Sequence, residues 1–146
     1  MAKKDFYLSK RSLKNLKGVH PDLVKVVKWA IKQSPHDFTV IEGVRTVERQ
    51  QSLYAIGRDG KGGAIVTNCD GVNKKSNHQP KEDGYGYAVD IYPFVDGYVR
   101  INESYVPFML KRIAKHIKEI AAQLGYTVVW GGDWKFKDIA HFELKK

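Results

Sequence analysis

Two segments in which polar and apolar residues alternate most constrain how this chain can fold. They are residues 87–91, Tyr-Ala-Val-Asp-Ile, and residues 139–144, Ile-Ala-His-Phe-Glu-Leu. In a strand, successive side chains point to opposite faces, so Asp90 lies on the face away from Tyr87, Val89 and Ile91. The same rule places His141 and Glu143 together on the polar face of the second segment. The two segments therefore predict strands whose polar faces line one cleft.

Four residues in or near these strands are of the types that hold and serve a metal ion: His78, Asp90, Asp138 and His141. Two imidazoles and one carboxylate leave a fourth coordination position for water or substrate, and the spare carboxylate can transfer protons. Asp138 and His141 differ by three positions and would face oppositely on a straight strand, so we expect Asp138 on the preceding loop. Imidazole ligands favour zinc over calcium or magnesium, which prefer oxygen ligands.

The order of these residues resembles the signature of a known family. Ser-x-His at 76–78, Gly-x-Ala-x-Asp at 86–90 and Asp-x-x-His at 138–141 are similar to the motifs of zinc peptidases grouped with D-Ala-D-Ala carboxypeptidases and dipeptidases. Within that group, the chain looks most like the single-domain phage endolysins that act as L-alanyl-D-glutamate peptidases. The resemblance extends from about Phe6 to Leu144.

The resemblance implies a cofactor and a role for each site residue. One zinc ion would be held by His78, Asp90 and His141, and Asp138 would be the general base. Arg45 would contact the substrate or the oxyanion that develops during hydrolysis, a task that suits its planar guanidinium.

The spacing of the first two ligands departs from the family pattern. Residues 79–89 separate His78 from Asp90, which is longer than usual in the family, as if residues 80–84 had been inserted. Asp83 is therefore a competing ligand. The Gly-x-Ala-x-Asp match favours Asp90.

Further residues are candidates for supporting or substrate-binding roles. Ser76 and Glu143 are expected to orient the ligand histidines, because a metal-bound imidazole usually makes a second hydrogen bond. Trp130 and Trp134 are expected to line the groove or pack in the core. The glycine-rich segment 58–75 predicts a long surface loop that leads to His78 and forms either a wall of the substrate groove or a connector.

The remaining patterns predict an α+β fold with a small antiparallel sheet and helices packed on one side, and the resemblance implies the hedgehog/D-Ala-D-Ala-peptidase-like version of that fold. Asp96 and Gly97 predict a two-residue hairpin between strands at 91–95 and 98–101. Strands are also expected at 38–41 and 127–130. Helices are expected from Ser9 to about Leu16, from Pro21 to before Pro35, from Thr46 to near Gly57, and from near Ser104 to Gly125.

Composition bounds the organisation of the chain. With 146 residues, 42% of them hydrophobic and 28% charged, we expect one zinc peptidase catalytic domain over residues 1–146, without a separate wall-binding domain. Cys69 is the only cysteine, so no intramolecular disulfide can form. No signal peptide or membrane span is recognisable. We therefore expect a monomer without stable membrane insertion that stays in the host cytoplasm until holin-type release to the periplasm and cell wall.

The net charge points to an anionic partner. The formal charge is +9 and the pI is about 9.6, which favours an anionic polymer as partner, and nucleic acid, lipopolysaccharide and anionic cell-wall polymers all qualify. Together with the family resemblance, the charge leads us to expect peptidoglycan and other anionic cell-envelope polymers as partners. The basic residues are scattered and no nucleic-acid-binding motif is recognisable, so we expect no nucleic-acid partner.

The sequence is compatible with several functions. The favoured one is a phage endolysin that hydrolyses the L-alanyl-D-glutamate bond of peptidoglycan stem peptides. A D-alanyl-D-alanine carboxypeptidase or dipeptidase would use the same metal site. From other classes, a thiol hydrolase could use Cys69 with His78, although no helix N-terminus is expected to activate the thiol, and a basic nucleic-acid-binding module is a further alternative.

Overall fold

The computed structural model describes residues 5–146. Its elements, in chain order, are α1 (Lys10–Asn15), α2 (Pro21–Lys32), β1 (Phe38–Glu42), α3 (Val47–Ala55), β2 (Ala88–Val95), β3 (Tyr98–Val99), α4 (Val106–Leu124), β4 (Thr127–Trp130), the 3-10 helix η1 (Gly131–Asp133) and β5 (His141–Lys145). Among the described residues, no helix combines the length and apolar character that crossing a membrane would require.

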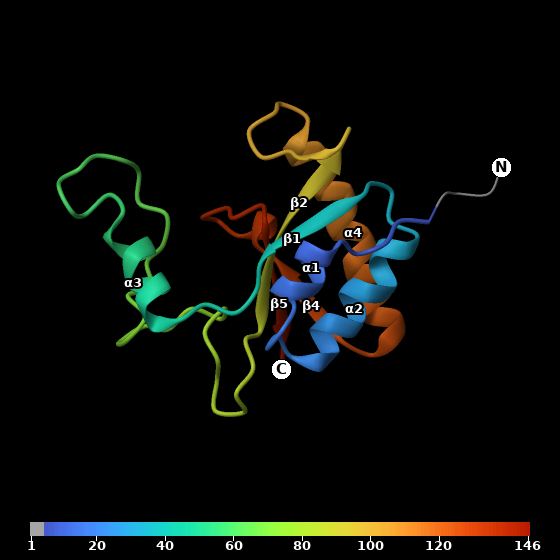
Figure 1. Cartoon of the computed structure of the whole chain (residues 1–146). Coiled ribbons are helices and arrows are strands. Elements are labelled where there is room, and N and C mark those ends of the chain that lie inside the picture. Colours follow the sequence, from blue (N-terminus) through green and yellow to red (C-terminus); the bar gives the residue numbers. More distant parts are fainter. Residues whose placement is uncertain (1–4) are drawn as a thin grey trace.

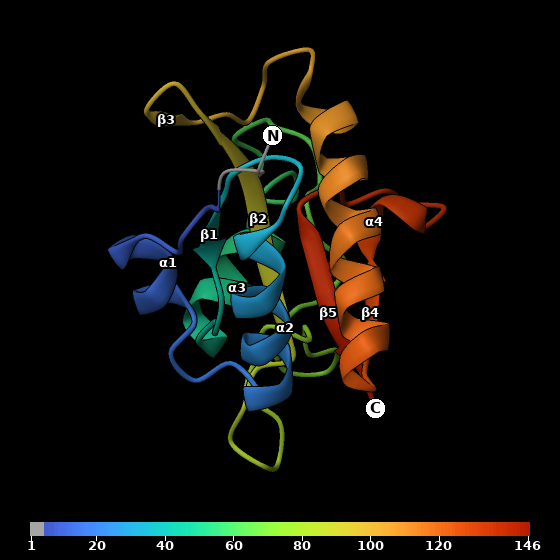
Figure 2. The same cartoon turned by 90° about the vertical axis from the view of Figure 1, so that its right-hand side faces the viewer.

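The strands form one antiparallel sheet in the order β1-β2-β5-β4, with β3 paired only to β2. In Figure 2, α2 and α4 lie side by side over one face of this sheet, and α3 lies behind it. Figure 1 shows α3 and the long loops on the opposite side of the sheet from α2 and α4. The α+β prediction is confirmed, with α3 as the helix that does not join the others.

The core lies between the sheet and the pair α2 and α4. Both helices bury apolar residues spaced three or four apart, as an amphipathic helix over a sheet requires. The sheet meets them with the apolar face of its strands, which leaves the other face for polar side chains. The buried apolar residues of this core are Leu23, Val26, Val27, Ala30 and Ile31 of α2, Val106, Leu110, Ile113, Ala114, Ile117 and Ala121 of α4, and Phe38, Val40, Val89, Ile91, Val128, Trp130, Phe142 and Leu144 of the strands.

Local signals in the sequence account for the ends of the helices. Ser9 and Thr46 each accept a hydrogen bond from a backbone N–H of the first turn that follows, at 3.1 Å in both cases, so they are the N-caps of α1 and α3. His20 caps α2 in the same way through Nδ1. Gly125 ends α4 in the left-handed conformation, with φ of 87°. These four boundaries agree with the predicted helices.

Helix α1 covers the exposed edge of the sheet. The backbone N–H of Val40 in β1 donates to Ser12 Oγ at 2.9 Å, and Asn15 Nδ2 donates to the carbonyl of Val40 at 2.8 Å. These bonds satisfy an edge strand that could otherwise pair with another chain.

Two connections have the expected character. Asp96 and Gly97 join β2 to β3 with φ values of 51° and 85°, as a type I′ hairpin turn requires. The strand after the turn is shorter than predicted, because β3 contains only Tyr98–Val99. Residues 58–75 contain no helix or strand, so this segment is the long loop that its glycines predict.

Candidate functional site

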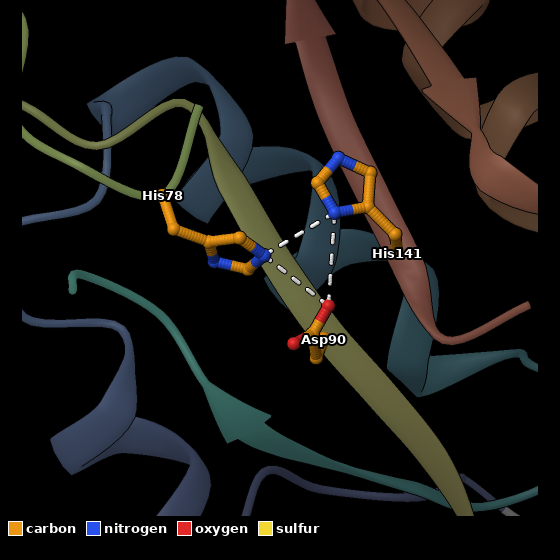
Figure 3. Close-up of side chains that lie close together, drawn as sticks. All are labelled: His78, Asp90 and His141. Atoms are coloured by element: carbon orange, nitrogen blue, oxygen red, sulfur yellow. Dashed lines mark hydrogen bonds and ion pairs between the residues drawn. The ribbon is translucent and has the colours of Figure 1, made fainter. Parts of the chain in front are cut away.

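Three side chains converge on the polar face of the sheet (Figure 3). Asp90 lies in β2 opposite His141, the first residue of β5. His78 comes from the loop that precedes β2. Asp90 Oδ1 lies 3.3 Å from His78 Nε2 and 3.7 Å from His141 Nδ1, and the two imidazole nitrogens are 3.2 Å apart. All three side chains are largely buried.

Backbone contacts fix the position of His78. Its carbonyl accepts from the N–H of Arg45 at 2.9 Å, and its ring Nδ1 lies 2.8 Å from the carbonyl oxygen of Gly43. Because a carbonyl can only accept, Nδ1 carries the hydrogen and Nε2 turns its lone pair to the site. Only glycine fits at position 43, because a Cβ at this position would lie 2.0 Å from the carbonyl oxygen of Asn15.

His141 is oriented by a carboxylate on its own strand. Its Nε2 lies 2.7 Å from Glu143 Oε1, and the other oxygen of Glu143 accepts from Asn77 Nδ2 at 2.9 Å. The carboxylate fixes the hydrogen on Nε2, so Nδ1 faces His78 and Asp90. Burial opposes the charge of Glu143, but its bonds to His141 and Asn77 outweigh burial and lower its pKa.

The distances within the site fit a zinc ion. Tetrahedral zinc with ligands at 2.0–2.1 Å places neighbouring ligand atoms about 3.3 Å apart, and the three separations here are 3.2, 3.3 and 3.7 Å. Asp90 Oδ1 is buried without a hydrogen-bond partner among the described residues. The three atoms all lie within 4.8 Å of one another. Two imidazole lone pairs and an unpaired carboxylate oxygen, aimed at one point, form a site suited to a cation.

In the absence of a cation, a protonated histidine balances the negative charge of the site. Burial disfavours the charged form of His141, but its interactions with Asp90 and Glu143 outweigh burial and raise its pKa to about 9. Burial also opposes the charge of Asp90, and its contacts with His141, His78 and Arg45 hold its pKa well below the ordinary range.

Arg45 lies beside the cluster and holds the second oxygen of Asp90. Its Nη2 donates to Asp90 Oδ2 at 2.9 Å, its Nε to Glu42 Oε1 at 2.7 Å, and its Nη1 to Gln50 Oε1 at 3.2 Å. The guanidinium therefore turns Oδ1 of Asp90 towards the two histidines. All three of its nitrogens donate to protein groups, so direct contact with substrate or oxyanion stays a prediction.

Asp138 lies on the loop before β5, as its spacing from His141 predicts. Its backbone N–H donates to the carbonyl of Gly131 at 3.0 Å, and its carbonyl accepts from the N–H of His141 at 3.1 Å. Among residues 5–146, nothing donates a hydrogen bond to its carboxylate, which lines the cleft. Partial burial and the neighbouring charge of Asp90 raise the pKa of Asp138.

The cluster opens into a cleft of about 490 Å³. Its walls come from the polar face of the sheet, α3, the loop before His78 and the loop before β5. The lining residues are Ile41, Glu42, Arg45, Leu53, Val66, Thr67, Cys69, Lys74, Lys75, Ser76, Asn77, His78, Asp90, Tyr92, Trp134, Asp138, Ala140, His141 and Glu143.

The structure separates the two candidate tryptophans. The ring of Trp134 lies 5.0 Å from that of His141 and lines the cleft. Trp130 lies in the core under α4, where it stacks on Phe142 and donates from Nε1 to the carbonyl of Ile139 at 2.8 Å. Its position on the helix-covered face removes it from the groove, so a substrate-binding role for Trp130 does not fit the structure.

Two other candidates lie away from the ring nitrogens of the cluster. Asp83 accepts from the N–H of Tyr85 at 3.0 Å and from the hydroxyl of Tyr87 on an exposed loop, outside the group of ligand atoms. Ser76 Oγ accepts from the backbone N–H of His78 at 3.2 Å. Ser76 therefore shapes the loop that carries His78 and does not touch its imidazole.

The thiol alternative finds little support in the geometry. Cys69 lines the cleft and is half-buried. Both ring nitrogens of His78 have other neighbours, Gly43 on one side and Asp90 with His141 on the other. Among the described residues, no imidazole therefore forms a hydrogen bond with this thiol, which a thiol nucleophile would need as its base.

Comparison with known proteins gives a consistent result. The family model described as phage L-alanyl-D-glutamate peptidase matches residues 4–146. The L-alanyl-D-glutamate peptidase of Escherichia phage T5 is 30% identical over 141 residues, covering 97% of this chain and 90% of that protein. The peptidoglycan L-alanyl-D-glutamate endopeptidase CwlK of Bacillus subtilis (strain 168) is 36% identical over 121 residues, covering 81% of this chain and 66% of CwlK.

A solved structure shows the same similarity in three dimensions. The crystal structure of the L-Ala D-Glu endopeptidase ChiX of Serratia marcescens matches with a TM-score of 0.71 and 33% sequence identity. The match covers 97% of this chain and 91% of the ChiX chain.

Proposed function

The chain belongs to the phage L-alanyl-D-glutamate peptidase family, and from this premise we propose that it cuts the L-alanyl-D-glutamate bond of peptidoglycan stem peptides at the site formed by His78, Asp90 and His141. The observation that carries the proposal is the convergence of three ligand atoms at zinc-like separations inside an open cleft. The peptidase class follows from the family.

His78 Nε2, His141 Nδ1 and Asp90 Oδ1 would hold one zinc ion. When bound, zinc would polarise the scissile carbonyl and lower the pKa of a water molecule at the open position. The protein's contribution is orientation: the carbonyl of Gly43 and the carboxylate of Glu143 hold the tautomers of the two histidines. Such outer contacts keep the ligands in place before the metal arrives.

Asp138 is the base in this proposal. Both oxygens of Glu143 are occupied by His141 and Asn77, whereas the carboxylate of Asp138 is free among the described residues and has a raised pKa. It takes a proton from the attacking water as the new C–O bond forms at the L-alanine carbonyl. It then gives that proton to the D-glutamate nitrogen as the C–N bond breaks.

The setting of the enzyme is also part of the proposal. We infer that it acts as a monomer, accumulates in the host cytoplasm and reaches the wall after holin-type release. A formal net charge of +9 supports attraction to peptidoglycan and other anionic envelope polymers, an attraction that salt would screen.

Digestion of purified peptidoglycan tests the bond assignment. Mass spectrometry of the fragments should find new N-terminal D-glutamate and C-terminal L-alanine. Free D-alanine as the main product would establish the carboxypeptidase alternative, and D-alanyl-D-alanine cleaved as a free dipeptide would establish the dipeptidase alternative.

A further inference from the structure

The substrate of the proposed reaction carries a negative charge beside the bond that is cut. Glutamate has two carboxyl groups and a peptide chain continues through only one, so the D-glutamate residue keeps a free carboxylate. This residue provides the amine of the scissile bond. A carboxylate that enters a partly buried cleft loses solvation and needs a cationic partner.

Two lysines line the cleft and can supply that cation. Arg45 lines it as well, but its guanidinium already binds Glu42, Gln50 and Asp90. Lys74 and Lys75 are exposed, and neither forms a salt bridge within residues 5–146. Both belong to the end of the long loop that enters the site.

The backbone of Lys74 is held in place although the loop has no regular structure. Asp70 Oδ1 accepts from three consecutive N–H groups, those of Val72, Asn73 and Lys74, at 2.9, 2.8 and 2.9 Å. The carbonyl of Lys74 in turn accepts from the N–H of Gly71 at 3.1 Å. This turn therefore holds the backbone of Lys74 at a defined position beside the cleft.

Two glutamine side chains hold this turn against the wall of the cleft through hydrogen bonds. Gln79 Nε2 donates to the carbonyl of Gly71 at 3.0 Å, and Gln50 Nε2 donates to the carbonyl of Cys69 at 2.8 Å. Gln50 also contacts Arg45. Gln50 therefore links the position of this turn to Arg45, the residue that orients Asp90.

The two lysines lie towards different ends of the cleft. Lys74 also lines a neighbouring hollow of about 650 Å³ whose walls include Trp134, Lys137 and Asp138. Lys137 does not line the cleft itself. Lys75 instead lines a hollow of about 690 Å³ on the other side, with Asn77 among its walls. The end near Lys74 is thus the end that contains the proposed base.

The leaving amine decides between the two lysines. Asp138 must reach the D-glutamate nitrogen to protonate it, so D-glutamate lies at the end of the cleft that Asp138 and Lys74 share. The geometry points to Lys74 as the residue that binds the free carboxylate of D-glutamate and makes the enzyme prefer an acidic residue on the amine side of the scissile bond. This inference rests on the proposed function.

Two synthetic stem peptides test it. They differ only at the free carboxyl group of D-glutamate, which is a carboxylate in one and a primary amide in the other. The zinc-loaded wild type should have a kcat/KM about tenfold or more higher for the carboxylate peptide. Lys74→Ala should lose this preference by losing activity on that peptide alone, and Lys74→Arg should keep most of it.

Matched variants control for charge and for folding. Lys75→Ala removes the neighbouring cation at the other end of the cleft, and Lys61→Ala removes an exposed cation from the same loop outside the cleft. Both should retain the preference for the carboxylate peptide. All variants should keep the zinc content and melting temperature of the wild type, because the substituted side chains are exposed.

The outcomes separate this inference from the proposed function. If the wild type cuts neither peptide between L-alanine and D-glutamate, the proposed function is wrong. If it cuts both equally well, or if Lys74→Ala keeps the preference, the function stands and the role of Lys74 is overturned. Loss of the preference in Lys75→Ala with its retention in Lys74→Ala would reverse the assigned orientation of the substrate.

Discussion

His78 and His141 present unlike ring nitrogens to each other, Nε2 from the first and Nδ1 from the second, at 3.2 Å. The opposite nitrogen of each ring is held by an acceptor, Gly43 O and Glu143 Oε1 respectively. Two lone pairs cannot face each other at this distance without a proton or a cation between them. The metal-free site therefore binds a proton that a metal ion must displace.

Zinc affinity should for this reason depend on pH up to about 9. The pKa of His141 in the metal-free protein is raised to about 9, so below that pH the ring is protonated and zinc must release the proton. The apparent affinity should rise about tenfold per pH unit from pH 7 towards 9 and then level off. With an unperturbed histidine, the zinc affinity would level off at about pH 6.5. Competition with a chromophoric chelator measures the zinc affinity. An affinity that does not change between pH 7 and 9 would contradict the presence of this proton.

Removing the acceptor behind His141 should weaken zinc binding without unfolding the protein. Glu143→Ala leaves Nε2 of His141 without its partner at 2.7 Å, and loss of such a contact typically costs about 10–100-fold in metal affinity. Glu143→Gln keeps an acceptor oxygen and is the matched control, with a smaller expected loss. Equal affinity in the wild type and Glu143→Ala would show that the strand backbone suffices to place His141.

Arg45 and Arg49 offer a matched pair for stability. Arg45 is largely buried and binds Glu42 and Asp90 at 2.7 and 2.9 Å. Arg45→Ala removes the shorter ion pair of Glu42 and the guanidinium partner of Asp90, so it should lower the free energy of unfolding of the metal-free protein by about 3–5 kcal/mol. Arg49 is mostly exposed and lies 3.6 Å from Glu42, so Arg49→Ala should cost less than about 1 kcal/mol. Denaturant unfolding measures both, and similar losses would mean that burial of Arg45 contributes nothing.

The sequence predicts the pairing of ligands better than their surroundings. Alternation alone places Asp90 and His141 on polar faces, and the sheet register brings them opposite each other. Alternation misplaces Glu42, which would share the core face with Phe38 and Val40. A bulge between Val40 and Glu42 turns it to the site instead, and no short-range signal marks that bulge.

Contacts between different elements explain why other site residues were not predicted. Gln50 reaches Arg45 from α3 and Asn77 reaches Glu143 from a loop, and neither partner can be read from local spacing. Tyr92 lies two residues beyond Asp90 on the same strand and lines the cleft, so alternation could have identified it. The two tryptophans lie four positions apart, and the turn at η1 sends Trp134 to the cleft while Trp130, at the end of β4, stays in the core.

Asp138 and His141 belong to one motif but have different proposed roles. Asp138→Asn preserves side-chain shape but removes the base, so the protein should stay folded, keep its zinc and lose roughly 10²–10⁴-fold in rate. His141→Ala removes a ligand and should lose the metal, together with the stability that metal binding adds to the folded state. Zinc content, melting temperature with and without zinc, and turnover of stem peptide should be measured for both variants.

The comparison tests the division of labour between Asp138 and Asp90. Asp138 has no hydrogen bond to its carboxylate among the described residues and lies outside the group of three ligand atoms, so its loss should leave zinc affinity within a few-fold of the wild type, whereas loss of Asp90 should abolish stoichiometric binding. Asp90→Asn is the direct control, since it makes the same chemical change at the other aspartate. If Asp138→Asn sheds zinc as His141→Ala does, Asp138 is a ligand or the support of one, and the base must be sought elsewhere in the cleft.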